Sequence, residues 1–192
     1  VPFPPGGSID VAVRAVQPGL AAELGQPIVI ENLGGAGGAL GAGRVAKAAN
    51  DGYTLLAGSI NDVVLAPVLN SKNVRYQPQD FTAVGPISSD SPLLVARRDL
   101  PMASLDEVIA ALRAKPDSVS YGSPGVGTMQ HLLMEDLQAR AKVQMLHVPY
   151  KGAQPLVTDL LGGQIDLAVM VAAPALPDIQ AGRLKELGGA GP

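Results

Sequence analysis

The sequence contains no cysteine and no tryptophan, and aromatic residues make up only 3% of its 192 residues. Without cysteine, disulfides, thiolate metal sites and cysteine nucleophiles are all excluded. A ligand held between stacked aromatic rings has few candidate partners, which are Phe3, Tyr53, Tyr76, Phe81, Tyr121 and Tyr150.

An excess of positive charge is also missing. The 14 Lys and Arg residues are outnumbered by 17 Asp and Glu, which gives a net charge of −3. With no basic run, nucleic acid and anionic membranes are poor candidate partners. No apolar run approaches the ~20 residues of a membrane-spanning helix, so we expect no direct membrane insertion. No signal peptide is visible, and residues 1–3 already read as a strand, so we expect the natural N-terminus to lie upstream.

The sequence is rich in hydrophobic residues, and Gly and Pro divide them into short runs. Hydrophobic residues make up 47%, while 23 Gly and 17 Pro stand at the joints between apolar runs, where they predict turns. Short β-branched runs alternate with helical stretches. We expect strands near 1–3, 27–31, 53–57, 83–87, 93–96, 119–121, 145–148 and 165–170. We expect helices near 8–24, 38–48, 104–114, 128–141, 154–161 and 173–181.

This alternation predicts an α/β fold with mostly parallel sheets and helices on both faces. The alternation runs in two series. We therefore expect a first lobe at residues 1–96, a hinge crossing at 97–103 and a second lobe at 104–192. In such a protein the ligand is expected in the cleft between the lobes.

Two segments, residues 1–10 and 120–131, share one local order of strand, Gly-rich turn and helix start. Glycine lets the backbone approach a ligand closely, and a helix start offers N–H groups and the positive end of the helix dipole. The pair therefore predicts a site for a carboxylate. Neither turn contains Lys or Arg, so backbone N–H groups and the hydroxyls of Ser8, Ser123 and Thr128 are the expected donors. The alternative is that both are ordinary turns of an α/β protein.

Signals for nucleotide binding are weak. Residues 41–46 match the pattern GxGxxA, but the preceding strand ends near Glu31, too far back for a dinucleotide turn. We expect the stretch 34–43 to be mostly a loop, with glycines that allow close helix packing. The segment 122–128 looks like a phosphate loop but has Thr128 where lysine is needed, which argues against an NTPase.

Catalytic patterns are poor as well. The sequence has no GxSxG elbow and no HExxH or comparable metal spacing, so we expect no catalytic residue, no metal and no cofactor. His131 is expected to line the cleft or to bond a loop, with a catalytic base as the less favoured reading. His147 is expected to be a structural residue at a strand end. Asp10 complements the helix dipole, or else orders its turn or meets a ligand amine or hydroxyl.

Further motifs follow one another along almost the whole chain. They are PFPPGGSID at 2–10, LGQPIVIEN at 24–32, GGAGG at 34–38, DGYTL at 51–55, GTMQH at 127–131, HVPYKG at 147–152 and DLLGGQID at 159–166. Together they resemble the receptors of the tripartite tricarboxylate transporter family, the Bug-type periplasmic solute-binding proteins. The resemblance implies a two-lobe Venus-flytrap fold of the type II periplasmic binding proteins, without catalysis. It also implies a periplasmic location, membrane transporter subunits as partners, and a small carboxylate solute such as a dicarboxylate, a tricarboxylate, an acidic amino acid or an aromatic carboxylate.

The resemblance also implies ligand-binding residues in both lobes. In the first lobe they are Phe3, Pro4, Gly7, Ser8 and Asp10, with Ser59 and Asn61 from a later loop. In the second lobe they are Ser123, Gly127, Thr128 and Gln130, with Val171, Ala172 and Ala173 from the last turn. The family often has an acidic or amide residue near that last turn, whereas this sequence is apolar from Met170 onward, which favours a less polar solute.

The end of the sequence departs from the family. Members continue after Lys185 into a strand that precedes a return to the first lobe, whereas residues 186–192 are not strand-like. We therefore expect a chain truncated at its C-terminus. An incomplete first lobe would expose a sheet edge and apolar surface, which predicts dimerisation, aggregation or weaker ligand binding.

Two other classes remain open. A nucleotide-dependent, dehydrogenase-like enzyme on an α/β scaffold would need GxGxxG directly after a strand and an acidic residue ~20 positions further on. A cytosolic regulator with a two-lobe effector-binding domain would be favoured by a helix-turn-helix upstream.

Overall fold

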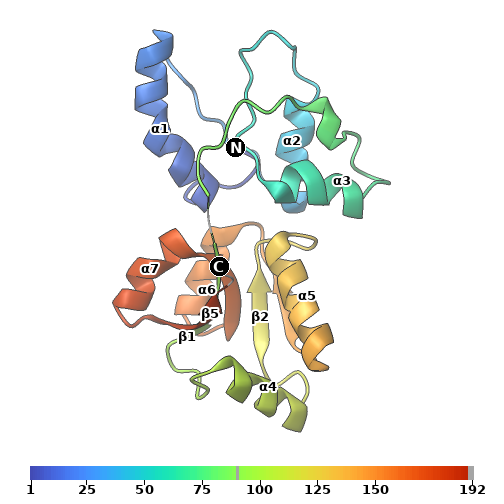
Figure 1. Ribbon diagram of the computed structural model, residues 1–192, viewed down its shortest axis with the longest axis vertical. Helices are drawn as coiled ribbons and strands as arrows, with labels where there is room; N and C mark the ends of the chain where they lie inside the picture. The colour runs from blue at the N-terminus through green and yellow to red at the C-terminus, as the bar shows by residue number, and fades with distance from the viewer. Residues whose placement is uncertain (90, 190–192) are drawn as a thin grey trace. The chain divides into compact units, whose positions relative to one another are not determined.

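The computed structural model describes residues 1–89 and 91–189 (Figure 1). Contacts between residues divide the chain into two compact units, Val1–Ser89 and Asp90–Pro192. Strand β1 (Pro92–Arg97) belongs to the sheet of the second unit. The lobe limits and the hinge predicted at 97–103 stay a prediction.

The first unit is built from helices and extended segments. Helix α1 (Ser8–Leu24) has the predicted bounds, and Gly25 ends it in the left-handed conformation with φ 64°. The shorter elements of this unit are η1 (Ala36–Gly38), α2 (Ala39–Val45), η2 (Asn61–Leu65), α3 (Ala66–Leu69) and η3 (Pro78–Asp80). Its buried core is small and centres on Ala42, Val74 and Tyr76.

The strands predicted at 1–3, 27–31, 53–57 and 83–87 are wrong for this structure, since no strand forms within residues 1–89. Each of the last three segments leaves a large apolar side chain in solvent: Val29 is 82% exposed, Tyr53 91% and Val84 88%. An isolated extended segment has no neighbour to satisfy its backbone groups or cover its side chains. The apolar pattern therefore indicates segments that could form strands but that pair with no neighbouring strand within residues 1–89.

The second unit contains a five-stranded sheet in the order β3-β2-β4-β1-β5. Besides β1, its strands are β2 (Ser120–Ser123), β3 (Leu146–Pro149), β4 (Leu167–Val171) and β5 (Leu184–Gly189). Strand β2 runs parallel to β3 and β4, whereas β1 lies antiparallel between β4 and β5. The sheet is therefore mixed, and the prediction of a mostly parallel sheet is wrong because β1 enters between its neighbours in the opposite direction.

Helices cover both faces of this sheet, as predicted. They are α4 (Leu105–Ala114), α5 (Met129–Ala141), α6 (Ala153–Leu161) and α7 (Ala172–Gln180), all labelled in Figure 1. Leu167 and Val169 of β4 join the core beneath α4 and α5, while Ala168 and Met170 join the core beneath α6 and α7. Successive residues of a strand point to opposite faces, so β4 is buried from both sides.

Strand β5 corrects the reading of the chain's end. Leu184–Gly189 pairs with β1, with a register shift between Leu94 and Val95. The expectation that residues 186–189 are not strand-like is therefore wrong, because the free edge of β1 offers a partner that outweighs the glycines. The rest of that segment lies outside the described residues. Among the helices that the structure describes, none is long and apolar enough to cross a membrane.

Candidate functional site

The first Gly-rich turn is ordered by a buried carboxylate. Asp10, 2% exposed, accepts hydrogen bonds from the Gly6 N–H at 2.8 Å, the Arg14 Nε at 2.9 Å and the Asn32 Nδ2 at 2.9 Å. The Asn32 amide also donates to the Phe3 carbonyl at 3.0 Å. The Arg14 hydrogen bond, supported by Gly6 and Asn32, holds the pKa of Asp10 well below its ordinary value despite burial. Asp10 thus closes the turn and ties it to the segment around Asn32.

The glycines of residues 34–43 allow this turn to be packed closely. A Cβ at Gly34 would lie 2.8 Å from the Cδ of Pro4, and one at Gly41 would lie 2.6 Å from the Cα of Pro2. A Cβ at Gly38 would lie 2.6 Å from the Cβ of Asp62. Such separations are below any normal carbon contact, so the backbone of this stretch lies directly against the turn.

The loop with Ser59 and Asn61 is organised by Asp62. The Oδ1 of Asp62 accepts from the Ser59 N–H at 2.9 Å and from the Ser59 Oγ at 2.7 Å, and the Asn61 N–H donates to that Oγ at 3.2 Å. Asp62 is fully buried, and its Oδ2 has no hydrogen-bond partner among the described residues. Burial raises the pKa of this carboxyl. We did not select Asp62 from the sequence, although an acidic residue opening the apolar run 63–69 was the available signal.

The N-terminal end of α1 has no capping side chain, which leaves it suited to an anion. Its N-cap is Gly7, and no side chain caps the helix. The N–H groups of the first turn, which begins at Ser8, therefore donate to no capping side chain, and the helix dipole makes this end positive. Phe3 and Asp62 both reach Gly38, so the predicted residues of the first unit belong to neighbouring segments.

The second Gly-rich turn satisfies its own hydroxyls. Thr128 caps α5 by accepting from the His131 N–H at 3.4 Å, and its Oγ1 donates to the Gly125 carbonyl at 2.7 Å. The Ser123 Oγ lies 3.2 Å from that carbonyl and 2.7 Å from the His147 Nε2. Ser123 and Thr128 are both fully buried, so in this structure they shape the turn.

A column of three stacked rings stands beside this turn. The ring centroids of Tyr121 and His147 are 4.7 Å apart, and those of His147 and His131 are 4.3 Å apart. The His131 Nδ1 accepts the Gly127 N–H at 3.2 Å, and the Tyr121 hydroxyl donates to Glu135 Oε1 at 2.5 Å. Burial, followed by the effect of Glu135, raises the pKa of Tyr121 above its ordinary value. The sequence did not indicate this stacking, because it depends on the pairing of β2 with β3.

The predicted residues of the second unit follow the carboxyl ends of two neighbouring strands of the sheet, β2 and β4. Strands β2 and β4 are parallel, so the turn after β2 and the turn after β4 follow carboxyl ends that lie side by side. This edge carries Ser123, Gly127, Thr128, Gln130, Val171, Ala172 and Ala173. Helix α7, like α1, begins without a capping side chain.

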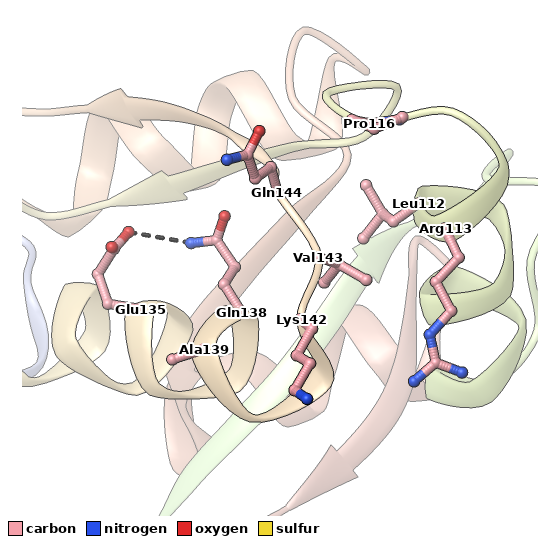
Figure 2. Close-up of a pocket in the computed structure, with 9 residues that line it drawn as sticks. All are labelled: Leu112, Arg113, Pro116, Glu135, Gln138, Ala139, Lys142, Val143 and Gln144. Atoms are coloured by element: carbon pink, nitrogen blue, oxygen red, sulfur yellow. Dashed lines mark hydrogen bonds between the residues drawn. The ribbon is translucent and has the colours of Figure 1, made fainter.

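Figure 2 shows a hollow in a different place. It has a volume of about 590 Å³ and is lined by Leu112, Arg113, Pro116, Glu135, Gln138, Ala139, Lys142, Val143 and Gln144. Pro116 and Gln144 precede β2 and β3, so the hollow lies at the opposite edge of the sheet from the predicted turns. Across the part of the chain that the structure describes, no group of three or more His, Cys, Asp or Glu could hold a metal.

The architecture is that of periplasmic solute-binding proteins. The chain is similar to a solved periplasmic transporter protein, with 35% identity, a TM-score of 0.85, and coverage of 100% of this chain and 64% of that one. It is also similar to a Rhodopseudomonas palustris protein solved with adipate, at 32% identity and a TM-score of 0.88 over 98% of this chain and 63% of that chain. MatC from Rhodopseudomonas palustris with bound malate gives 34% identity and a TM-score of 0.88 over 100% and 65%.

Within that class, the model of the tripartite tricarboxylate transporter family receptor matches residues 12–191. The chain belongs to this family, which confirms the resemblance of the motifs. It is 37% identical to BugT of Bordetella pertussis over 97% of this chain and 58% of that protein. It is 36% identical to a protein encoded in the tcbD-tcbE intergenic region of Pseudomonas sp. strain P51, over 98% and 56%. The chain thus spans little more than half the length of these relatives. The description of the family is that of a transporter receptor.

Proposed function

We propose that the protein is an extracytoplasmic receptor that captures a small carboxylate and delivers it to the membrane subunits of a tripartite tricarboxylate-type transporter. The observation that carries this proposal is the family match over residues 12–191, together with two structural relatives solved with adipate and malate. Both molecules are dicarboxylates of similar size. The transporter subunits as partners follow from the description of the family.

We further propose that the two units are the lobes of a type II Venus-flytrap receptor and that each contributes one Gly-rich turn to the ligand site. In the first lobe we assign Phe3, Pro4, Gly7, Ser8, Asp10, Ser59 and Asn61. In the second we assign Ser123, Gly127, Thr128, Gln130, Val171, Ala172 and Ala173. Support comes from the uncapped start of α1, where backbone N–H groups and a partial positive charge suit a carboxylate.

Within this site the residues have two kinds of task. Asp10, Ser123 and Thr128 are buried and hydrogen-bonded inside their turns, so they hold the backbone that meets the ligand. Ser8 and Gln130 are partly exposed at helix starts and are the proposed direct contacts. Because neither turn supplies a full positive charge, binding depends on the number and direction of N–H donors, which favours a ligand of fixed geometry.

A thermal-shift screen of the full-length natural protein tests the proposal. Adipate and malate are compared with NAD and ATP at equal concentration. A ligand of the folded state raises stability by mass action, by about 2.7 kcal/mol at 100 times its Kd. We expect a carboxylate to raise Tm and the nucleotides to leave it unchanged. Stabilisation by NAD or ATP, with none from the carboxylates, would instead support the dehydrogenase-like alternative.

A further inference from the structure

The second Gly-rich turn is held in shape by two imidazoles rather than by a lysine or an arginine. We propose that His131 and His147 are positioning residues, and that the unprotonated Nδ1 of His131 fixes the Gly127 N–H and so sets the shape of the ligand-binding turn. The consequence for ligand affinity rests on the proposed function, whereas the positioning role itself does not.

The hydrogen bond to His131 defines its protonation state. The Gly127 N–H donates to Nδ1 at 3.2 Å, and an imidazole nitrogen accepts a hydrogen bond only when it carries no proton. His131 is therefore neutral, with its proton on Nε2, which lies 3.8 Å from Glu135 Oε1. Gly127 has φ 80° and Gly125 φ 156°, which glycine adopts readily. Because glycine also adopts many other conformations, contacts from neighbouring side chains help to keep the turn in this one.

The ring column supplies those contacts at both ends of the turn. His147 lies between the other two rings, at 4.7 Å from Tyr121 with an interplanar angle of 14° and at 4.3 Å from His131 with an angle of 23°. Its Nε2 meets the Ser123 Oγ at 2.7 Å, where the turn begins, while His131 holds Gly127, where the turn ends. Tyr121 is fully buried in β2 and anchors the column to the sheet.

The ionisable side chains around the ring column lie on α5, after β3 and on α6. The carboxylate of Glu135 lies beside His131 and accepts from the Tyr121 hydroxyl. Its Oε1 also accepts from the Gln138 Nε2 at 2.9 Å (Figure 2). Strand β4, which α5 also covers, carries only apolar side chains. After β3, Tyr150 donates its hydroxyl to Asp159 and Lys151 is exposed.

Protonation of His131 has a defined structural effect. Burial, followed by the neighbouring His131, lowers the pKa of His147, so two stacked imidazoles do not share two charges easily. A proton added to His131 goes to Nδ1, because Nε2 already carries one. Nδ1 of His131 then becomes a donor that faces the Gly127 N–H, and the turn loses its contact. The turn is therefore intact while His131 is neutral and loosens when His131 is protonated.

NMR of the ligand-free, full-length protein between pH 8 and pH 5 tests this role directly. We expect the His131 nitrogens to report the Nε2–H form at pH 8. We expect the Gly127 amide resonance to move with the same midpoint as the His131 ring. A proton on Nδ1 at pH 8, or a Gly127 amide that ignores the titration of His131, would overturn the proposal.

Two substitutions connect the role to binding, with malate and adipate as probes. His131→Leu removes the acceptor and is expected to weaken binding by about 2–10-fold, the weight of one hydrogen bond. His131→Asn retains an acceptor oxygen and is expected to restore most of the affinity and to remove its pH dependence. Asp136→Asn, on the exposed face of α5, is the control and should change neither.

The outcomes of the two experiments separate the two proposals. If neither malate nor adipate binds, the proposed function fails and the ligand-free NMR still decides the role of His131. If both bind with an affinity that His131→Leu and pH leave unchanged, the receptor function stands and the positioning role falls.

Discussion

Asp10 and Asp62 are two buried carboxylates in opposite environments. Asp10 accepts hydrogen bonds at both oxygens, and its pKa is lowered chiefly by Arg14. Asp62 is satisfied at Oδ1 by Ser59, while burial raises its pKa and Oδ2 has no hydrogen-bond partner in the described chain. The two residues should therefore respond to pH with opposite signs.

Asp10→Asn should destabilise the full-length protein by about 2 kcal/mol at pH 7, because it removes hydrogen bonds to a buried charged group. The lowered pKa of Asp10 means that its contribution is complete above the unfolded value of about 3.9 and is lost as the pH falls below it. Urea unfolding at pH 7 and pH 3 measures both effects. Glu31→Gln is the matched control, since its ion pair with Arg44 is exposed and is worth little. Equal effects of the two substitutions would contradict the structural role of Asp10.

Asp62→Asn tests the opposite sign. A folded-state pKa raised by burial gives stabilisation that is present at low pH and is lost as the pH rises above about 3.9 through the folded value. When the pH falls from 7 to 4.5, the free energy of unfolding of the natural protein should therefore rise relative to that of the variant. Chemical unfolding at several pH values measures this difference. A difference that shrinks on acidification would show that Asp62 is ionised in the fold.

At the scale of elements, the helices were the most predictable part. Helix α1 was predicted with its exact bounds, and α4 and α5 begin after Ser104 and Thr128, whose side chains cap them. Local signals such as caps and C-terminal glycines act within a few residues, so a sequence displays them. The strands near 53–57 and 83–87 failed because a strand depends on a neighbour that local sequence does not specify.

The site shows the same division. The two Gly-rich turns were visible because each is contiguous in the sequence. The ring column was not, since it requires Tyr121 of β2 opposite His147 of β3. The role of Asp62 was also hidden, because it depends on the approach of Gly38 from another segment.

Two glycines of α2 provide a matched pair for the packing against the first turn. Gly41→Ala should destabilise by about 1–3 kcal/mol, because its Cβ would lie 2.6 Å from Pro2 Cα and 2.7 Å from the Leu33 carbonyl oxygen. Gly43→Ala should be neutral or stabilising by up to about 1 kcal/mol, since its Cβ meets Tyr76 at an ordinary 3.5 Å and alanine favours a helix. Thermal unfolding of both variants measures the contrast, and similar losses would contradict the close approach at Gly41.

Two helix caps separate stability from binding. Thr128→Ala and Ser104→Ala each remove a capping hydroxyl, so each should destabilise by about 1 kcal/mol. Thr128 also holds Gly125 in the proposed ligand-binding turn, whereas Ser104 caps α4, which is not part of that turn. Malate affinity should therefore fall in Thr128→Ala alone, and Thr128→Ser should recover it. Calorimetric titration gives the affinities, and a loss of affinity in both alanine variants would assign the effect to general stability.

At the scale of the whole molecule, the two units differ in how well they are packed. The second has a sheet covered on both faces, while the first leaves apolar side chains such as Val29, Tyr53 and Val84 in solvent. The predicted self-association of this chain stays a prediction, and it has a physical basis in these exposed side chains.

The central claim is that one carboxylate is bound by the backbone of both Gly-rich turns. Malate titration of the ¹⁵N-labelled full-length protein measures this through the amide resonances of residues 6–10 and 125–130. We expect both sets to shift and to give one common Kd. A response confined to one turn, or shifts with two unrelated midpoints, would contradict the account.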